Sequence, residues 1–231
     1  MNKKRGQIKR GDSTAHKMLE MGVSAFTQFG PDGISTRELA KKAKVNISAI
    51  GYYFGGKENY YCEVVRHLIA NNARPVLLAF DQAKEDLNKS GKGKEAASDI
   101  LRKLITIIIE AVILNPETRA VASIFSREQL HPTKASAIIY KEAIVKVKST
   151  FEDLITAATE TKPGAAETIV YAHFLAGQML IFNLGADTLC KSLGLQKMEK
   201  KDAAFIAKTV SDVIYKIISS DKTPRVERSM K

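Results

Sequence analysis

ISTRELAKKAKVNISAIGYYFGGKENYY, residues 34–61, is the stretch that decides the fold of this chain. It contains two short helical patterns, and each is too small to be stable alone. Ser35 or Thr36 can cap the first, because a hydroxyl accepts from the free amides at a helix start. Glu38 stands three residues after Ser35, as a capping box requires. The apolar face of this first helix consists of Leu39, Ala40 and Ala43.

The second helical pattern begins after Asn46, a residue type favoured in turns and at helix N-caps. Ile47, Ile50 and Phe54 follow at spacings of three and four and form its apolar face. The other face carries small or aromatic side chains and no carboxylate: Ser48, Ala49, Gly51, Tyr52 and Tyr53. Two helices joined by a tight turn, the second small enough to enter a groove, predict a helix-turn-helix.

These residues resemble the DNA-binding domain of TetR-type transcriptional regulators. The matching positions are Thr36, Ala43, Val45, Tyr53-Phe54, Gly55-Gly56 and Lys57, preceded by Ala25-Phe26, Phe29-Gly30 and Gly33. The family usually has a Tyr, often on a phosphate, where this chain has Gly51, so Tyr52 or Tyr53 is the expected replacement. Downstream, FSREQLHPT at 125–133 and HFLAGQMLIFNLG at 173–185 resemble the C-terminal domain of the CecR branch of that family.

The resemblance implies an all-α protein with an N-terminal three-helix domain and a C-terminal helical domain. We expect a helix-turn-helix domain at 1–60, a ligand-sensing and dimerisation domain at 61–220 and a polar tail at 221–231. The implied function is a ligand-responsive transcriptional regulator, with repression as the usual mode. Its implied partners are a palindromic double-stranded DNA operator, a second copy of the chain and a small hydrophobic effector, which releases the DNA.

Short side chains let a recognition helix approach the base edges, and Ser48, Ala49 and Gly51 have them. Ile47 can meet a thymine methyl group. Hydroxyl and ammonium groups suit phosphates, and we expect such contacts from Thr36, Tyr52, Tyr53 and Lys57. Arg37 can reach guanine bidentately or bind a phosphate. For the two tyrosines, the alternative is packing in the three-helix core.

The net charge of +11 suits a polyanionic partner or a membrane surface. Residues 1–60 hold 11 Lys and Arg against five Asp and Glu, so the first quarter carries over half of the excess. We expect a basic arm at 1–11, which either follows the DNA backbone or is a solvated tail. A protein that binds anionic lipid is a rival interpretation of the same charge. A third is a helix-turn-helix protein that has no small-molecule ligand.

Cellular location is predicted to be cytoplasmic, without a membrane partner. No apolar core follows MNKKR, as a signal peptide would require. The longest apolar run, Leu104 to Leu114, contains Glu110 and is too short to span a bilayer. Cys62 and Cys190 do not make a disulfide framework.

Periodicity predicts helices along the rest of the chain. The expected ranges are 13–29, 57–87, 95–114, 117–128, 134–160, 165–190 and 200–219. Pro75 predicts a kink or break within 57–87. Helices 165–190 and 200–219 are the candidate dimer interface, with Ala176, Gly177, Leu180, Phe205 and Val213. The candidate ligand contacts are Tyr171, His173, Gln178 and Asn183, each of which can equally be a core or interface residue.

Two further patterns in the sequence do not indicate catalysis. Arg127 and Glu128, beside His131, are expected to have a structural role in an internal salt bridge that fixes the helix at 117–128 to the next one. A signal path through this corner is the alternative. The spacing of Gly51, Gly56 and Lys57 matches a phosphate loop, but Glu58 replaces the required Ser or Thr and no strand precedes it. The histidines and cysteines lack metal-ligand spacing. We therefore expect no enzyme activity, no cofactor and no metal.

Overall fold

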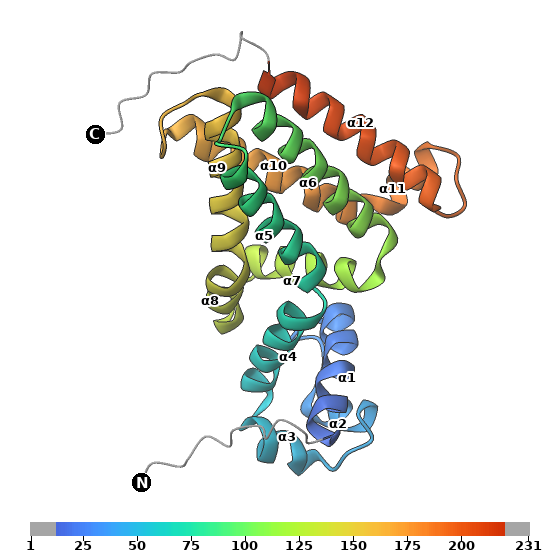
Figure 1. Cartoon of the computed structure of the whole chain (residues 1–231). Helices are drawn as coiled ribbons and strands as arrows, with labels where there is room; N and C mark the ends of the chain where they lie inside the picture. The colour runs from blue at the N-terminus through green and yellow to red at the C-terminus, as the bar shows by residue number, and fades with distance from the viewer. Residues whose placement is uncertain (1–12, 220–231) are drawn as a thin grey trace. The chain divides into compact units, whose positions relative to one another are not determined.

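The computed structural model describes residues 13–219, which form helices joined by short connections (Figure 1). The described residues contain no strand, and this confirms the predicted all-α class. The expected basic arm at 1–11 and the polar tail at 221–231 lie outside the described residues.

The chain divides into two compact units. Among the described residues, one consists of 13–73 with Ala120–Glu142, and the other of Arg74–Arg119 with 143–219. The first unit therefore includes a segment from the middle of the chain beside the predicted helix-turn-helix. The boundaries at residues 60 and 220 remain predictions from the sequence.

Four helices build the start of the first unit: α1 Ser13–Phe29, α2 Thr36–Lys42, α3 Ile47–Phe54 and α4 Lys57–Asn71. The helix predicted at 13–29 is confirmed at both ends. α1 packs on α4, and a Cβ added to Gly22 of α1 would stand 2.4 Å from Val64 of α4. Because that distance is shorter than any real contact, the two helices approach closely only with glycine there.

The segment predicted as a helix over 57–87 is broken, as Pro75 indicated. α4 ends at Asn71, and α5 runs over Arg74–Lys89. Pro75 is the second residue of α5, where the amide that proline lacks has no helical partner in any case.

The other segment of the first unit is the later part of α7 Pro116–Leu130, followed by α8 Lys134–Ile139. A π-helix at Tyr140–Ile144 comes next, and the second unit begins within it, at Ala143. α9 Val145–Thr159 then continues in the second unit. The sequence predicted one regular helix over 134–160, so the π-helical turn is a correction. π-helical turns have a wider hydrogen-bond ring than the α-helix, and 3.6-residue periodicity does not reveal them.

The second unit is built around α6 Lys94–Leu114, which packs against α5, α9, α10 Ala166–Leu184 and α12 Lys200–Ser219. Figure 1 shows α6 between α5 and α12. The buried residues of α6 include Leu101, Leu104, Ile105, Ile108, Ile109 and Val112, as expected for a helix that is apolar on most sides. The rings of Phe80 and Phe151 meet edge to face in the same core, with centroids 5.1 Å apart.

The helix predicted over 165–190 is wrong in one respect, because the chain bends at Gly185. α10 ends at Leu184, and α11 Ala186–Ser192 continues at an angle of 71°. No single helix in 13–219 is long and apolar enough to cross a membrane, although the bent pair α10 and α11 passes that test by length and composition.

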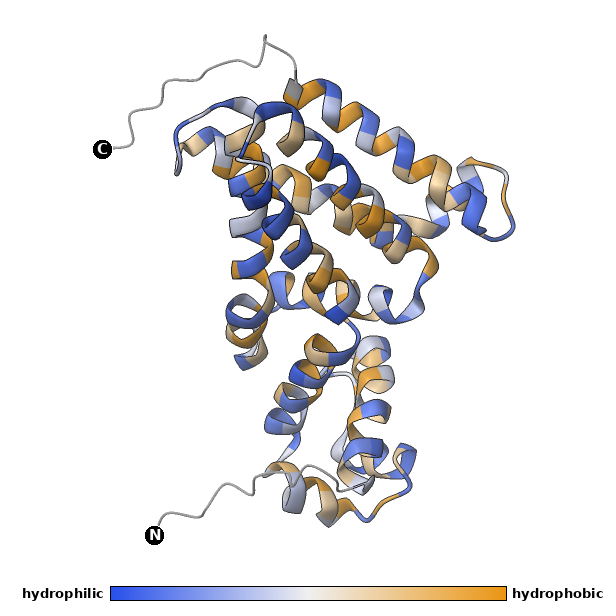
Figure 2. Ribbon diagram, viewed as in Figure 1, coloured by the Kyte–Doolittle hydropathy of each residue, from blue (hydrophilic) through white to orange (hydrophobic). Residues whose placement is uncertain are grey.

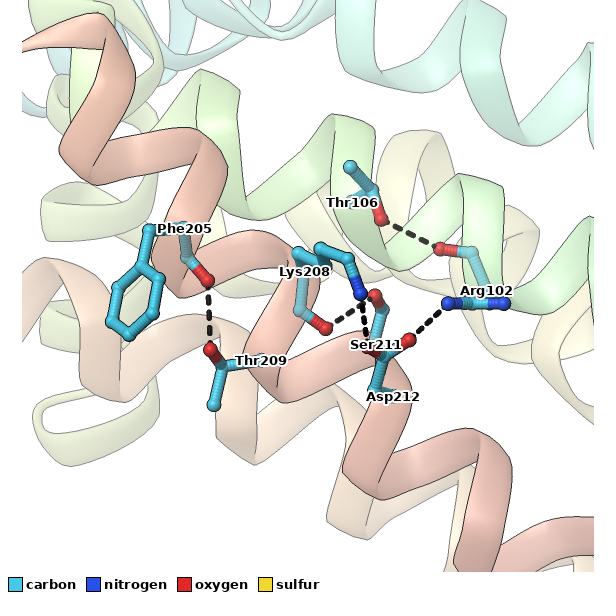
Figure 3. A network of polar contacts seen from close by, with 7 residues as sticks. All are labelled: Arg102, Thr106, Phe205, Lys208, Thr209, Ser211 and Asp212. Carbon is cyan, nitrogen blue, oxygen red and sulfur yellow. Dashed lines mark hydrogen bonds and ion pairs between the residues drawn. The ribbon is translucent and has the colours of Figure 1, made fainter.

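A polar network fastens α12 to α6 (Figure 3). The guanidinium of Arg102 donates to Asp212, which also accepts from Lys208 over 2.7 Å. Lys208 and then Arg102 lower the pKa of the Asp212 carboxyl below its ordinary value. Figure 2 shows hydrophobic and hydrophilic positions alternating along α12. The buried hydrophobic ones are Ala203, Ile206, Ala207, Ile214 and Ile218.

Candidate nucleic-acid interface

A capping box starts the helix-turn-helix, as the sequence predicted. The Ser35 hydroxyl accepts from the Glu38 amide at 3.2 Å, and the Ser35 amide donates to Glu38 Oε2 at 2.8 Å. The hydrogen bond from the Ser35 hydroxyl lowers the pKa of Glu38, and Lys42 and Lys57 add smaller effects in the same direction. The box fixes where α2 begins and therefore where the turn after it lies.

The turn between α2 and α3 closes in the pattern called a Schellman motif. The Val45 amide donates to Ala40 O at 3.0 Å, and the Lys44 amide donates to Lys41 O at 3.2 Å. The motif requires left-handed backbone at its centre, and Lys44 has a φ of 54°. A lysine therefore stands where glycine is the usual residue.

α3 begins at a side-chain cap and ends at a glycine. The Asn46 carboxamide oxygen accepts from the Ser48 amide at 3.0 Å and from the Ser48 hydroxyl at 2.9 Å. Gly55 ends the helix with a φ of 72°, in the left-handed region that glycine adopts most easily. Both ends of α3 are thus specified locally by the sequence.

The two faces of α3 differ sharply in exposure. Ile50 and Phe54 are buried, at 0% and 6% of their full exposure, and fix the helix on the unit. Tyr52 is 80% exposed and Ile47 is 49% exposed. Ser48 and Gly51 are also exposed, whereas Ala49 and Tyr53 are half-buried. The exposed face carries short side chains, one branched apolar group and one phenol, and no carboxylate.

Aromatic rings link the exposed tyrosine to the core. Tyr52 and Tyr53 meet edge to face with centroids 5.0 Å apart, and Tyr53 lies 6.3 Å from Phe54. Phe54 stacks on Tyr60 at 4.4 Å. Tyr53 is therefore partly a packing residue, whereas the exposed Tyr52 is not.

The remaining predicted DNA contacts lie at helix starts in the same unit. Thr36 begins α2 and is half-buried, while Arg37 beside it is exposed. Lys57 begins α4 and is half-buried. Lys44, which is not among the predicted contacts, is exposed in the turn before α3.

An internal salt bridge was expected at Arg127 and Glu128, but the Arg127 guanidinium binds main-chain carbonyls at the end of α1. Nη1 donates to Phe26 O at 2.6 Å, and Nη2 reaches Thr27 O at 3.5 Å. The last carbonyls of a helix have no partner within it, and a cation there is favourable. A Cβ at Gly30, which has a φ of 72°, would stand 2.6 Å from Arg127 Nη1, so glycine leaves room for this contact.

Glu128 makes its own contacts within the same unit. It is 2% exposed and accepts from the Tyr61 hydroxyl at 2.9 Å, from the Thr133 amide at 2.9 Å and from the Thr133 hydroxyl. Burial and the bond to Glu128 raise the pKa of Tyr61, so this phenol stays a donor. The segment FSREQLHPT thus fastens α4 and the end of α1 and is a structural part of the helix-turn-helix unit.

The four candidate ligand residues on α10 do not line one common site. His173 is exposed and lines a groove of about 320 Å³ between α9 and α10. Its other lining residues are Ile144, Val147, Lys148, Phe151, Ile169, Val170, Ala172 and Ala176. Tyr171 instead packs against the core, where burial raises its pKa. Gln178 and Asn183 are half-buried farther along α10.

The candidate dimer residues differ in exposure. Phe205 is 65% exposed and Val213 is 51% exposed, both on α12. Figure 3 shows the Phe205 ring directed away from Arg102 and Thr106 of α6. Gly177 is exposed on α10, whereas Ala176 and Leu180 are half-buried.

Comparisons with known proteins match both units. A model described as bacterial regulatory proteins of the tetR family matches residues 19–60. A model described as the C-terminal domain of the HTH-type transcriptional dual regulator CecR matches residues 97–219, more than half of the chain. CecR of Shigella flexneri is 27% identical over 205 residues, which cover 87% of this chain and 90% of that protein.

The HTH-type transcriptional repressor NicS of Pseudomonas putida is 25% identical over 213 residues, which cover 90% of this chain and 93% of that protein. Two solved structures share the fold. The hemolysin II transcriptional regulator HlyIIR superposes with a TM-score of 0.59 at 20% identity, over 90% of this chain and 98% of that one. PfmR of Thermus thermophilus gives 0.60 at 12% identity, over 86% and 94%.

These matches agree with the helix-turn-helix geometry of the first unit and with the expectation that the chain is no enzyme. The chain belongs to the TetR family of transcriptional regulators and carries a C-terminal domain of the CecR type.

Proposed function

We propose that two copies of this chain bind one palindromic operator, with the exposed face of α3 from each copy in the major groove. The observation that carries the proposal is the division of α3 into two faces. Ile50 and Phe54 hold the helix on the unit, while Ile47, Ser48 and Gly51 are exposed. Short exposed side chains allow the backbone to approach base edges, and Ile47 suits a thymine methyl group.

A homodimer is supported by apolar stripes on two helices of the second unit. On α10 the exposed apolar residues outside the lining of the groove between α9 and α10 are Phe174, Ile181 and Leu184. On α12 they are Phe205, Val213 and Ile217. Both helices also bury another face against α6, so these stripes are surplus to the folding of one copy. A two-fold interface that buries the same stripes on both copies would remove them from water.

A small hydrophobic effector is supported by the groove between α9 and α10. Its volume of about 320 Å³ is at the lower end of small-molecule sites, which span about 300–1,000 Å³. Apolar side chains dominate the lining, and Lys148 and His173 are the polar groups there. This composition favours a ligand-responsive regulator over one without a ligand. A ligand that prefers one spacing of the two DNA-binding units would lower DNA affinity by that preference.

Repression is the mode we propose, and the cytoplasm the location, since the DNA lies there. NicS is called a repressor and CecR a dual regulator. Both align with nearly the whole of this chain, and the name of NicS supports repression.

Selection of bound duplexes from a random pool tests this function. We expect an enriched palindrome whose half-sites are about one helical turn, roughly 34–36 Å, apart. Repeating the selection with apolar compounds tests the effector, which should reduce recovery of that palindrome. Enrichment of nothing, or of a single asymmetric site, would contradict the operator and the homodimer.

A further inference from the structure

At two positions in the helix-turn-helix, the backbone conformation favours a different type of residue from the one present. Lys44 has a left-handed backbone, which favours glycine, and Gly51 lies inside an α-helix, which disfavours glycine. Glycine in place of Lys44, or a better helix former in place of Gly51, would make the isolated chain more stable. An external contact would explain why the chain has them as they are.

Lys44 lies at the centre of the turn between α2 and α3. Its φ is 54°, in the left-handed region, where the Cβ of any residue other than glycine comes close to the backbone. Glycine adopts this conformation without that cost. The lysine is exposed and adjoins the start of α3. An ammonium at that place is positioned to meet a phosphate of any duplex that α3 enters.

Gly51 lies in the middle of the eight-residue helix α3, on its exposed face. A Cβ built at Gly51 would have no atom within 4 Å. The chain's own packing therefore does not require glycine at this position. Nor does the backbone require it, because Gly51 is helical. Gly51 removes a side chain from the part of α3 that would face DNA, which allows a closer approach of backbone to base edges.

We propose that Lys44 and Gly51 are DNA-contact positions, with Lys44 on a phosphate and Gly51 at the point of closest approach between the α3 backbone and the bases. This inference rests on the proposed function and deepens it. Lys44 contributes affinity for every duplex, because phosphates are common to all sequences. Gly51 contributes to the choice of sequence, because only a fitting set of base edges tolerates so close an approach.

Lys92 provides a matched comparison for Lys44. It is also an exposed lysine with a positive φ, 59°, but it lies in the second unit, at the connection between α5 and α6. Lys92→Gly removes the same charge and relieves the same backbone conformation as Lys44→Gly. A difference in DNA affinity between these two variants is therefore due to where the lysine lies in the structure, because the loss of charge and the change of backbone are the same in both.

The experiment measures thermal stability and DNA affinity of the full chain and of Lys44→Gly, Lys92→Gly and Gly51→Ala. The probes are the duplex enriched from the random pool and an unrelated duplex of equal length. Gly51→Ala should raise the Tm by about 2–4 °C. Each Lys→Gly variant should raise it by about 2 °C. An increased Tm shows that the variant is folded, so that a loss of DNA affinity cannot be due to unfolding.

Lys44→Gly should bind both duplexes several-fold more weakly and flatten the salt dependence, with a slope smaller by about 0.9 for each phosphate that the protein no longer neutralises. Lys92→Gly should bind like the parent chain. Gly51→Ala should bind the enriched duplex roughly tenfold more weakly and the unrelated duplex almost unchanged.

The result identifies which idea fails. If the parent chain enriches no duplex, the proposed function is wrong. If the parent chain binds but Lys44→Gly matches Lys92→Gly, or Gly51→Ala keeps full affinity for the enriched duplex, the inference is wrong and the function stands.

Discussion

Arg127 Nη1 donates to the main-chain carbonyl of Phe26 over 2.6 Å, although the two residues are 101 positions apart in the chain. Phe26 belongs to the last turn of α1, directly before the turn that leads into α2. A cation at that carbonyl fixes the end of α1. The part of the chain that resembles the CecR branch thus contributes a side chain to the helix-turn-helix unit.

Removing the guanidinium should therefore destabilise this unit. We expect Arg127→Ala to lower the free energy of unfolding by about 1.5–3 kcal/mol, as for hydrogen bonds that involve a charged group. Arg127→Lys should recover part of the loss, because one ammonium can still reach Phe26 O. Urea unfolding measures both. Arg37→Ala is the control, since Arg37 is exposed in the same unit and should change stability by less than about 0.5 kcal/mol. Equal midpoints for Arg127→Ala and the control would show that the contact is unimportant.

The bond between Tyr61 and Glu128 should be detectable as a coupling energy. Tyr61→Phe leaves a buried carboxylate without one donor, and Glu128→Gln changes the same contact from the other side. A double-mutant cycle should give a coupling of about 0.5–3 kcal/mol. Tyr140→Phe, at a side chain that is 57% exposed, removes a hydroxyl without this cost. Strictly additive effects of the first two changes would exclude a direct interaction.

Acid should weaken the capping box at the start of α2. The folded chain holds the pKa of Glu38 below its ordinary value of 4.5, mainly through the Ser35 hydroxyl. The unfolded chain consequently binds the proton more tightly. The stabilisation is present above pH 4.5 and is lost as the pH falls through the folded-state pKa.

Glu38→Gln keeps an acceptor for the box but removes the titrating group. We expect its stability to lie below that of the parent chain at about pH 7 and to converge with it as the pH falls below 4.5. Chemical unfolding across that range measures the difference. A gap that is constant with pH would contradict the role of the Glu38 charge. Ser35→Ala, which removes the cap itself, should cost about 1 kcal/mol at neutral pH.

A charge on the exposed stripe of α12 should separate the proposed dimer without unfolding the chain. Phe205 and Val213 are 65% and 51% exposed in one copy, so lysine at either position meets water there. In the two-fold dimer this lysine would be buried in the interface together with the same lysine of the second copy. Sedimentation velocity should show a dimer for the parent chain and a monomer for Phe205→Lys and Val213→Lys. Leu78→Lys, at a 53% exposed residue of α5, should remain dimeric. Monomeric parent chain would refute the interface.

Local signals in the sequence predicted the local features of the fold. Ser35 with Glu38 and Asn46 marked the starts of α2 and α3 because capping involves residues two or three positions apart. Pro75 marked the break after α4 in the same way. The sequence predicted a structural role for Arg127 and Glu128 but not their partners, because Phe26 and Tyr61 are distant from them in the chain.

The lining of the groove and the bend at Gly185 could not be predicted from the sequence either. His173 was a candidate for its chemistry, yet periodicity could not place Tyr171 on the core side of α10 and His173 on the groove side. Glycine is tolerated within helices and also ends them, so Gly185 alone did not decide between a continuous helix and two. Lys44 was overlooked because its significance depends on a backbone angle.

The most direct measurement of the central claim attaches an iron chelate to α3 and records where it cuts DNA. Ser48→Cys, in a Cys190→Ser background that leaves Cys62 buried, places the chelate on the exposed face of this helix. We predict cuts at two positions related by the two-fold axis of the enriched palindrome. Lys103→Cys, on α6 in the second unit, should give none there. Uniform cutting along the duplex, or identical patterns from both variants, would contradict the claim that α3 enters the groove.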